Sequence, residues 1–125
     1  SYERLKLYLL NLGHTFIAEQ WLNGNRPKDE LVLEAMNDEN IRNELEALWR
    51  EEVLPVFAAD GLGEQAEAYV ITVRERFLNP FLKHRIADIA SNHAEKKQRR
   101  FIPIIARAKE LGLDLEQRRL KAAVG

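Results

Sequence analysis

The helical pattern is clearest in residues 2–21, which read YERLKLYLLNLGHTFIAEQW. The apolar residues of one side repeat at i, i+4, i+7 and i+11, the spacing of one face of an α-helix: Leu5, Leu9, Leu12 and Phe16. A second set of apolar residues lies on the other side: Leu7, Leu10, Ile17 and Trp21. A helix that is apolar on two sides is buried on both, or faces a second partner on one of them.

Helical spacing continues through the rest of the chain, and strand alternation is nearly absent. We therefore expect an all-α fold, a single helical domain of about six to seven helices. After the first helix, the expected helices cover about 27–37, 38–60, 64–78, 81–92 and 93–111, with a short one near the C-terminus. We found no internal repeat and no low-complexity stretch.

Particular residues are expected to set the helix boundaries. Asp38 and Asp114 can cap the helices that follow them. Pro55 and Pro103 lack an amide donor, so each should kink or bend its helix. We expect the third helix to end at Gly61 and Gly63 and the fourth at Asn79-Pro80. The inward side of the fifth helix should be formed by Leu82, Ile86 and Ile89. The tail is expected to fray from Lys121.

Composition narrows the functional classes. The 125 residues carry a net charge of -1, so no general field attracts the chain to nucleic acid or to an anionic membrane. There is no cysteine, which excludes disulfides and thiolate metal sites and leads us to expect a cytoplasmic protein. No apolar run is long enough to span a bilayer. Because helical periodicity starts directly at Ser1, we expect further sequence upstream.

Three polar residues interrupt the second apolar side of the first helix. At roughly 100° per residue, Lys6, His14 and Asn11 fall at about 0°, 80° and 140°. Apolar neighbours would desolvate Lys6 and favour its neutral form, which suits a general base, while Asn11 and His14 could hold a charged oxygen. The alternative is structural: Lys6 extends to solvent, Asn11 is exposed and His14 is a satisfied core histidine. Spacing alone favours this alternative.

Two motifs resemble those of one enzyme family. Residues 6–14, KLYLLNLGH, resemble the lysine-x4-asparagine-x2-histidine signature of the polyol-specific long-chain dehydrogenases. Residues 75–84, ERFLNPFLKH, resemble the arginine-phenylalanine-x-asparagine-proline segment of the same family. The family includes mannitol 2-dehydrogenase, mannitol-1-phosphate 5-dehydrogenase, and the fructuronate and tagaturonate reductases. The resemblance covers nearly the whole chain.

The resemblance implies a domain and a chemistry. Residues 1–125 would form the substrate-binding and catalytic C-terminal domain, of the type found in 6-phosphogluconate dehydrogenase. An N-terminal Rossmann domain, absent from this chain, would be its partner in cis and would bind NAD or NADP. The substrates would be a polyol or aldonate and the corresponding keto sugar or keto sugar acid, and no metal would be needed. No glycine-rich nucleotide-binding turn is present, since Gly61-Leu62-Gly63 follows no strand, so the isolated chain is expected to be inactive.

The resemblance also implies residue roles. Lys6 would be the general acid/base, and Asn11 and His14 would orient the carbonyl or alkoxide oxygen. Arg76 would contact the polar end of the substrate. His84 would contact the substrate as well, unless it pairs with Asp88 four residues later, and the sequence leaves both possibilities open.

Other functions are less well supported. The run Lys96-Lys97-Gln98-Arg99-Arg100 is expected to be a solvated helix face rather than a nucleic-acid contact, and contact with a phosphate of cofactor or substrate stays open. The three histidines lie on separate helices, so a metal site is not expected. The rival hypothesis is a non-catalytic helical protein-interaction domain. It predicts that Lys6, Asn11, His14 and Arg76 are scattered, whereas a dehydrogenase needs them to converge on one open cleft.

Overall fold

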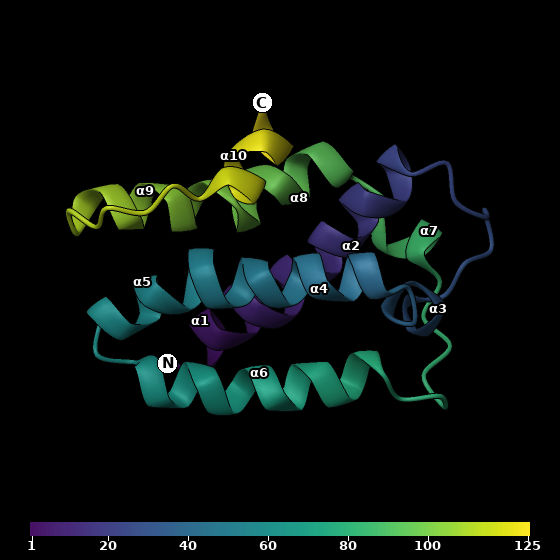
Figure 1. Ribbon diagram of the computed structural model, residues 1–125, viewed down its shortest axis with the longest axis horizontal. Helices are drawn as coiled ribbons and strands as arrows, with labels where there is room; N and C mark the ends of the chain where they lie inside the picture. The colour runs from purple at the N-terminus through teal and green to yellow at the C-terminus, as the bar shows by residue number, and fades with distance from the viewer.

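The first helix runs through the middle of the computed structural model, which describes residues 1–125 (Figure 1). It is continuous from α1 (Tyr2–Leu5) through the π-helical turn η1 (Lys6–Asn11) to α2 (Leu12–Asn23). Every residue of α2 from Leu12 to Ala18 is buried. Of the two alternatives left by the sequence, burial on both sides therefore holds for the α2 part of the helix.

Six further helices follow the first. The second is α3 (Val32–Met36), and the third is one long helix made of α4 (Glu39–Ala47), η2 (Leu48–Val53) and α5 (Leu54–Ala59). The fourth and fifth are α6 (Gly63–Phe77) and α7 (Ile86–Ile89). The sixth is broken into α8 (His93–Arg100) and α9 (Ile102–Glu110), and the last is α10 (Arg118–Val124). There is no strand, only an isolated bridge between Leu31 and Arg85. The all-α, single-domain prediction is confirmed.

The helices are arranged in layers around the first one. In Figure 1, α8, α9 and α10 lie along one side of the molecule and α6 lies along the opposite side. The first helix and the long α4–η2–α5 helix lie between them, while α3 and α7 close one end. The central helix therefore contacts elements from both halves of the chain, including α4, α7 and α8.

Several expected helix boundaries are confirmed. The Asp38 carboxylate accepts hydrogen bonds from the amides of Asn40 and Ile41, at 2.9 and 3.4 Å, and so caps α4. The disturbance expected at Pro55 takes the form of η2, in which the Leu54 amide donates to the Trp49 carbonyl five residues earlier. Pro103 likewise coincides with the break between α8 and α9 at Phe101.

The expected helix over 81–92 is wrong in its first half. Residues 82–85 are extended, and the His84 carbonyl accepts a hydrogen bond from the Val32 amide at 2.9 Å. The Ile86 amide in turn donates to the Glu30 carbonyl at 3.0 Å. These contacts also delay the second helix, which begins at Val32 instead of near Pro27, and they leave Leu82 exposed instead of facing inward.

The C-terminal expectations are also wrong. Asp114 caps no helix, because α10 begins only at Arg118, after Gln117 in the left-handed region with φ 49°. The tail does not fray at Lys121: α10 continues to Val124, and Leu120 and Ala123 are buried.

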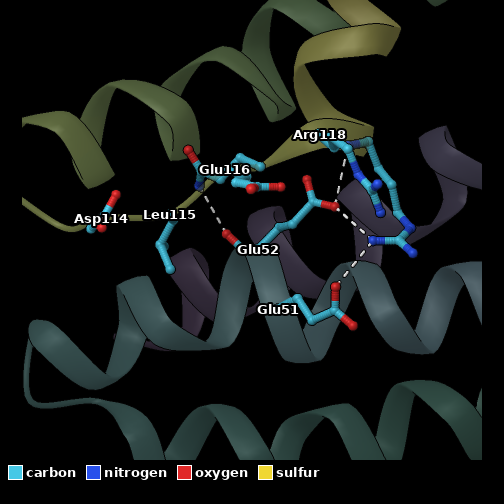
Figure 2. A pocket seen from close by; sticks show the side chains of 8 residues that line it. Glu51, Glu52, Asp114, Leu115, Glu116 and Arg118 are labelled. Carbon is cyan, nitrogen blue, oxygen red and sulfur yellow. Dashed lines mark hydrogen bonds and ion pairs between the residues drawn. The ribbon is translucent and has the colours of Figure 1, made fainter.

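A buried carboxylate holds α10 in place. Glu52, in η2, is 2% exposed, and its carboxylate accepts hydrogen bonds from the amides of Arg119 and Leu120 at 3.2 and 3.0 Å (Figure 2). Its backbone carbonyl accepts a third hydrogen bond, from the Gln117 side-chain amide at 2.9 Å. Glu52 thus caps the first turn of a helix more than sixty residues away in sequence, where a negative charge also complements the helix dipole. The surface hollow of about 200 Å³ beside it is consequently lined by structural groups.

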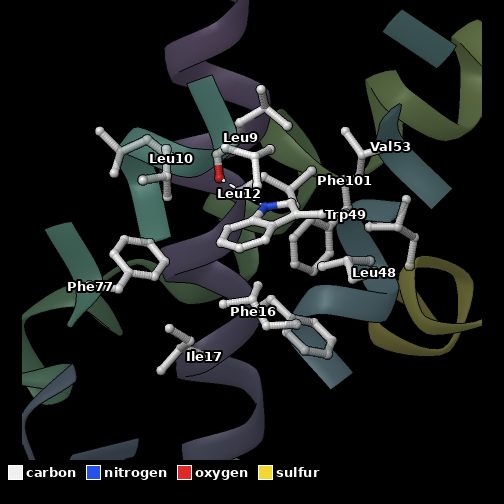
Figure 3. Packing of buried hydrophobic residues seen from close by; sticks show 14 of the residues in the cluster. Leu9, Leu10, Leu12, Phe16, Ile17, Leu48, Trp49, Val53, Phe77 and Phe101 are labelled. Carbon is white, nitrogen blue, oxygen red and sulfur yellow. Dashed lines mark hydrogen bonds between the residues drawn. The ribbon is translucent and has the colours of Figure 1, made fainter. Parts of the chain in front are cut away.

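The core is built around Trp49. Its indole, 1% exposed, donates a hydrogen bond from Nε1 to the Leu9 carbonyl at 3.3 Å, which joins η2 to η1. Figure 3 shows this ring between Phe77 and Phe101, with Leu9 and Leu10 of the first helix beside it. A Trp buried among apolar side chains needs such an acceptor for its N–H.

Gly13 allows the rings to approach the first helix closely. A Cβ atom at this position would lie 3.2 Å from Trp49 Cζ2 and 3.2 Å from the Phe77 ring. Both distances are shorter than an ordinary carbon–carbon contact of about 3.5–4.0 Å. Any side chain at position 13 would therefore displace one of two large, buried rings.

The first prediction is that Gly13→Ala destabilises the chain by about 1–3 kcal/mol, the usual cost of overpacking. Helix propensity alone predicts the opposite, since Gly inside a helix is less favourable than Ala by roughly 0.5–1 kcal/mol. Urea unfolding of the two proteins measures the difference. A midpoint equal to or above that of the unchanged chain would show that the rings do not constrain position 13.

The second prediction concerns Glu52. Glu52→Gln keeps the volume of the side chain but replaces one of the two acceptor oxygens with an amide group that points its N–H toward the start of α10. We therefore expect the free energy of unfolding to fall by about 1–3 kcal/mol. Glu51→Gln is the matched control, because Glu51 is the exposed neighbouring carboxylate and should change stability by no more than about 0.5 kcal/mol. Equal unfolding midpoints for the two variants would refute the capping role.

Candidate active site

The π turn η1 changes the alignment of the polar residues on the first helix. In η1 the Leu12 amide donates to the Leu7 carbonyl five residues earlier, so the turn takes up one extra residue. Residues after it are set back by about 100° relative to an unbroken α-helix. Asn11 and His14 then lie at roughly 40° and −20° from Lys6, instead of the 140° and 80° expected from the sequence. The π turn therefore brings the three residues onto one face.

Lys6 and Asn11 lie at the accessible end of this face. Lys6 is exposed and forms no ion pair, and Asn11 is half-buried at the junction with α2. The expectation that apolar neighbours desolvate Lys6 is wrong within this chain, because the preceding helix α1 contains no buried residue. Both side chains are free to contact a ligand.

His14 lies deeper, against an aromatic wall. Its ring stacks on Phe77 with centroids 4.5 Å apart, and the edge of the His84 ring approaches it at 5.2 Å. The side chain is 9% exposed, and its Nε2 atom is buried without a hydrogen-bond partner in the chain. His14 is thus buried but unsatisfied, which contradicts the alternative of a satisfied core histidine.

The surroundings of His14 keep it neutral. Burial is the main cause, and the positive charges of His84, Arg76, Arg100 and Lys96 add to it; together they lower the pKa of His14 to about 3. A neutral imidazole can donate a hydrogen bond from one nitrogen and accept one at the other. It is unsuited to carry a proton near neutral pH.

Arg76 and His84 approach His14 from other elements. Arg76 lies in the last turn of α6, is exposed, and has no carboxylate partner, whereas Arg74 two residues earlier is held by Glu46 through two hydrogen bonds of 2.6 Å. His84 is exposed on the extended segment before α7. The alternative of a His84–Asp88 pair is wrong, because the only ion pair of a histidine joins His93 and Glu19.

Asn79 has the structural role expected of a turn residue. Its side-chain oxygen accepts a hydrogen bond from the Phe81 amide at 2.8 Å. This contact shapes the chain between α6 and the extended segment that carries His84.

For two residues of the charged run on α8, Lys96 and Arg100, the sequence left contact with a phosphate of cofactor or substrate open. The charged run was expected to be a solvated face, but Lys96 and Arg100 are half-buried and their charges reach His14. The Arg100 guanidinium donates to the hydroxyl of Thr15, the residue after His14, at 2.9 Å. Their spacing of four residues on one helix was the available signal.

The structure brings part of the predicted site together. Arg76, His84, Lys96 and Arg100 converge on His14 from three elements, and Lys6 and Asn11 extend the same face of the first helix. None of the five main surface hollows is lined by any of these side chains, so the chain by itself does not show the single open cleft that the dehydrogenase hypothesis requires. No group of three His, Asp or Glu side chains could hold a metal ion. None of the helices combines the length and apolar character needed to cross a bilayer.

A third prediction follows from the neutral His14. Its pKa of about 3 in the folded state lies below the value of about 6.5 in the unfolded state, so below that pH the unfolded state binds a proton that the folded state does not. The free energy of unfolding should therefore fall as the pH drops from about 6.5 toward about 3, by up to about 1.4 kcal/mol per pH unit. His14→Gln removes this dependence, which urea unfolding at several pH values can measure. Identical slopes for the two proteins would contradict a neutral His14.

Comparisons with known proteins agree with the motifs. A family model described as the mannitol dehydrogenase C-terminal domain matches residues 1–125. An altronate oxidoreductase from Halalkalibacterium halodurans is 36% identical over 104 residues, which cover 82% of this chain and 19% of that protein. An altronate oxidoreductase from Escherichia coli O1:K1 / APEC is 32% identical over 102 residues, covering 82% of this chain and 20% of that protein. The chain thus spans about a fifth of the length of these relatives, and no solved structure matches it. It belongs to the mannitol dehydrogenase C-terminal domain family.

Proposed function

We propose that this chain is the substrate-binding and catalytic domain of an NAD(P)-dependent oxidoreductase that interconverts a polyol or aldonate and the corresponding keto sugar or keto sugar acid. The observation that carries the proposal is the buried, unpartnered Nε2 atom of His14. It lies on the same helix as Lys6 and Asn11, and next to Arg76 and His84. A buried polar atom without a partner has a large incentive to bind a ligand.

His14 would position the reacting oxygen. Because its pKa is far below neutrality, the ring stays uncharged and acts through hydrogen bonds alone. The stacked Phe77 ring fixes its orientation, which preorganises the site for an oxygen on which negative charge develops. The amide group of Asn11 would donate a second hydrogen bond to the same oxygen.

Lys6 would move the proton. During oxidation its amine would accept the proton of the substrate hydroxyl, and during reduction it would return the proton to the carbonyl oxygen. Its exposed position at the open end of the face leaves room for the substrate and for a further domain. His14 is unsuited to this task, so the two residues would have separate roles.

The hydride carrier would be held outside this chain. The only glycine-rich stretch, Gly61-Leu62-Gly63, connects the helices α5 and α6 and follows no strand, so it does not fit the nucleotide-binding turn. We propose that NAD or NADP is bound by a Rossmann domain elsewhere in the same polypeptide. The relatives, about five times as long as this chain, have room for such a domain.

The assay that tests the proposal uses the full-length protein. Oxidation of NADH or NADPH is followed with tagaturonate, fructuronate, fructose and fructose 6-phosphate as substrates. The names of the similar proteins lead us to expect the highest kcat/KM with tagaturonate, whose reduction yields altronate. No oxidation of either nucleotide with any of these substrates would refute the proposed activity.

The fourth prediction separates the role of Lys6 from that of other lysines. Lys6→Ala in the full-length protein should lower kcat by about 10²–10⁴-fold, the usual contribution of a general acid/base. The fold should be unaffected because Lys6 is exposed and unpaired, which circular dichroism and the unfolding midpoint can verify. Lys28→Ala, an exposed lysine in the loop before α3, is the matched control and should keep full activity. Normal turnover by Lys6→Ala would exclude the mechanism.

A further inference from the structure

The charged run on α8 divides into two pairs of cations with different partners. Lys97 and Arg99 are paired with acids: Lys97 Nζ lies 3.1 Å from Glu19, and Arg99 Nε lies 3.8 Å from Glu95. Lys96 and Arg100 are four residues apart on the same helix, and neither forms an ion pair. One short run therefore contains two compensated and two uncompensated cations.

The uncompensated pair is held in place by neutral acceptors. Lys96 Nζ donates to the Ile89 carbonyl at the end of α7, at 2.7 Å, and Arg100 Nη1 donates to the Thr15 hydroxyl at 2.9 Å. Both side chains are half-buried. The remaining N–H groups of the Arg100 guanidinium make no hydrogen bond in the chain. The two cations are thus positioned without having their charge neutralised.

Carboxylates hold most of the other partly buried arginines of the chain, although Arg42 donates to the Met36 carbonyl at 3.0 Å and has no carboxylate partner. Arg26 is bound by Glu30 and Asp38, Arg107 by Asp60, and Arg119 by Glu44 and Glu52, all through carboxylates. Removing a cation from water without a counter-charge is costly, and burial lowers the pKa of both Lys96 and Arg100. An anion supplied from outside the chain would remove that cost.

The pair lies at the candidate active site. The charges of Lys96 and Arg100 act on His14 together with that of Arg76, which has no carboxylate partner either. His14, the neighbour of Thr15 to which Arg100 donates, is 9% exposed and has a buried Nε2 atom without a partner in the chain. A ligand that binds here would meet a neutral hydrogen-bonding group beside a cluster of free cations.

We infer that Lys96 and Arg100, with Arg76, form a specificity site that binds the anionic end of a sugar substrate while its reacting end lies at His14. The inference rests on the proposed function. A carboxylate or a phosphate fits this chemistry, because the planar guanidinium can donate two parallel hydrogen bonds and the lysine adds a point charge. A neutral polyol has no group that uses these charges.

The fifth prediction is a change in substrate preference in the full-length protein. Lys96→Gln and Arg100→Gln should each lower the ratio of kcat/KM for tagaturonate to kcat/KM for fructose by roughly 10- to 100-fold, the range for losing a hydrogen bond to a charged group. Arg100→Lys should restore part of the ratio, because it keeps the charge but not the fork. Arg99→Gln, which removes a cation that is paired with Glu95, is the control and should leave the ratio unchanged.

Fructose 6-phosphate distinguishes the two anion sources. If the variants lower the ratio of kcat/KM for fructose 6-phosphate to kcat/KM for fructose and leave the ratio for tagaturonate to fructose unchanged, the bound group is a phosphate. That result would still support an anion site for the substrate. If both ratios stay constant while the KM for NADH or NADPH rises, the cations serve the cofactor and the inference is overturned.

A binding measurement separates this inference from the proposed activity. Calorimetry measures the binding of altronate and of mannitol without turnover. Altronate should bind with the higher affinity. This difference in affinity should disappear in the Lys96→Gln and Arg100→Gln variants and become smaller at high salt. Such binding by a protein without oxidoreductase activity would support the anion site and refute the function. Equal affinity for the two compounds in the unchanged protein and in both variants would refute the anion site, whatever the activity.

Discussion

The close approach of Trp49 and Phe77 to Gly13 is the constraint on which the rest of the structure depends. Trp49 reaches the first helix because position 13 has no side chain, and its indole then finds the Leu9 carbonyl as an acceptor. Phe77 packs on the same glycine and provides the surface on which His14 stacks. The core and the candidate active site therefore share one wall. A change that moves this wall must alter both the stability of the chain and the orientation of the His14 imidazole.

The two π turns are best understood from this contact. Each interrupts the regular pattern of a long helix, η1 beside Leu9 and η2 at Trp49, and the indole hydrogen bond joins them. Departures from regular helix geometry have a local cost and are frequent at functional sites. Here η1 has a definite consequence, because it rotates His14 and Asn11 toward Lys6. In η2 the widened turn precedes Pro55, which lacks a donor, and it includes Glu52, whose carboxylate caps α10. The irregular turns thus hold together parts of the chain that are distant in sequence.

Local patterns predicted most of the helices, whereas long-range contacts explain what was missed. The buried face of the first helix, the Asp38 cap and the break near Pro103 depend on neighbours within a few residues, so they can be read from the sequence. The extended residues 82–85 depend on backbone bonds to Glu30 and Val32. The start of α10 depends on Glu52, more than sixty residues earlier. The same division holds for the candidate site. Short motifs identified five of its residues: Lys6, Asn11, His14, Arg76 and His84. Lys96 and Arg100 differ from the neighbouring cations of α8 only in having no acid close by, and the positions of the acids are known only from the folded structure.

The net charge of -1 conceals how unevenly the charges are used. Carboxylates of the chain compensate Arg26, Arg74, Arg107 and Arg119, while the cations around His14 receive none. A protonated histidine among them would add a further positive charge, and the low pKa of His14 avoids this. Neutral His14 and uncompensated cations are therefore two aspects of one arrangement: the imidazole can hold an oxygen without competing for the proton, and the cations keep their charge for a ligand. In the proposed mechanism the proton would therefore be moved by a group outside the cationic cluster, and Lys6, which is exposed on the same helix, is the amine that we propose for this step.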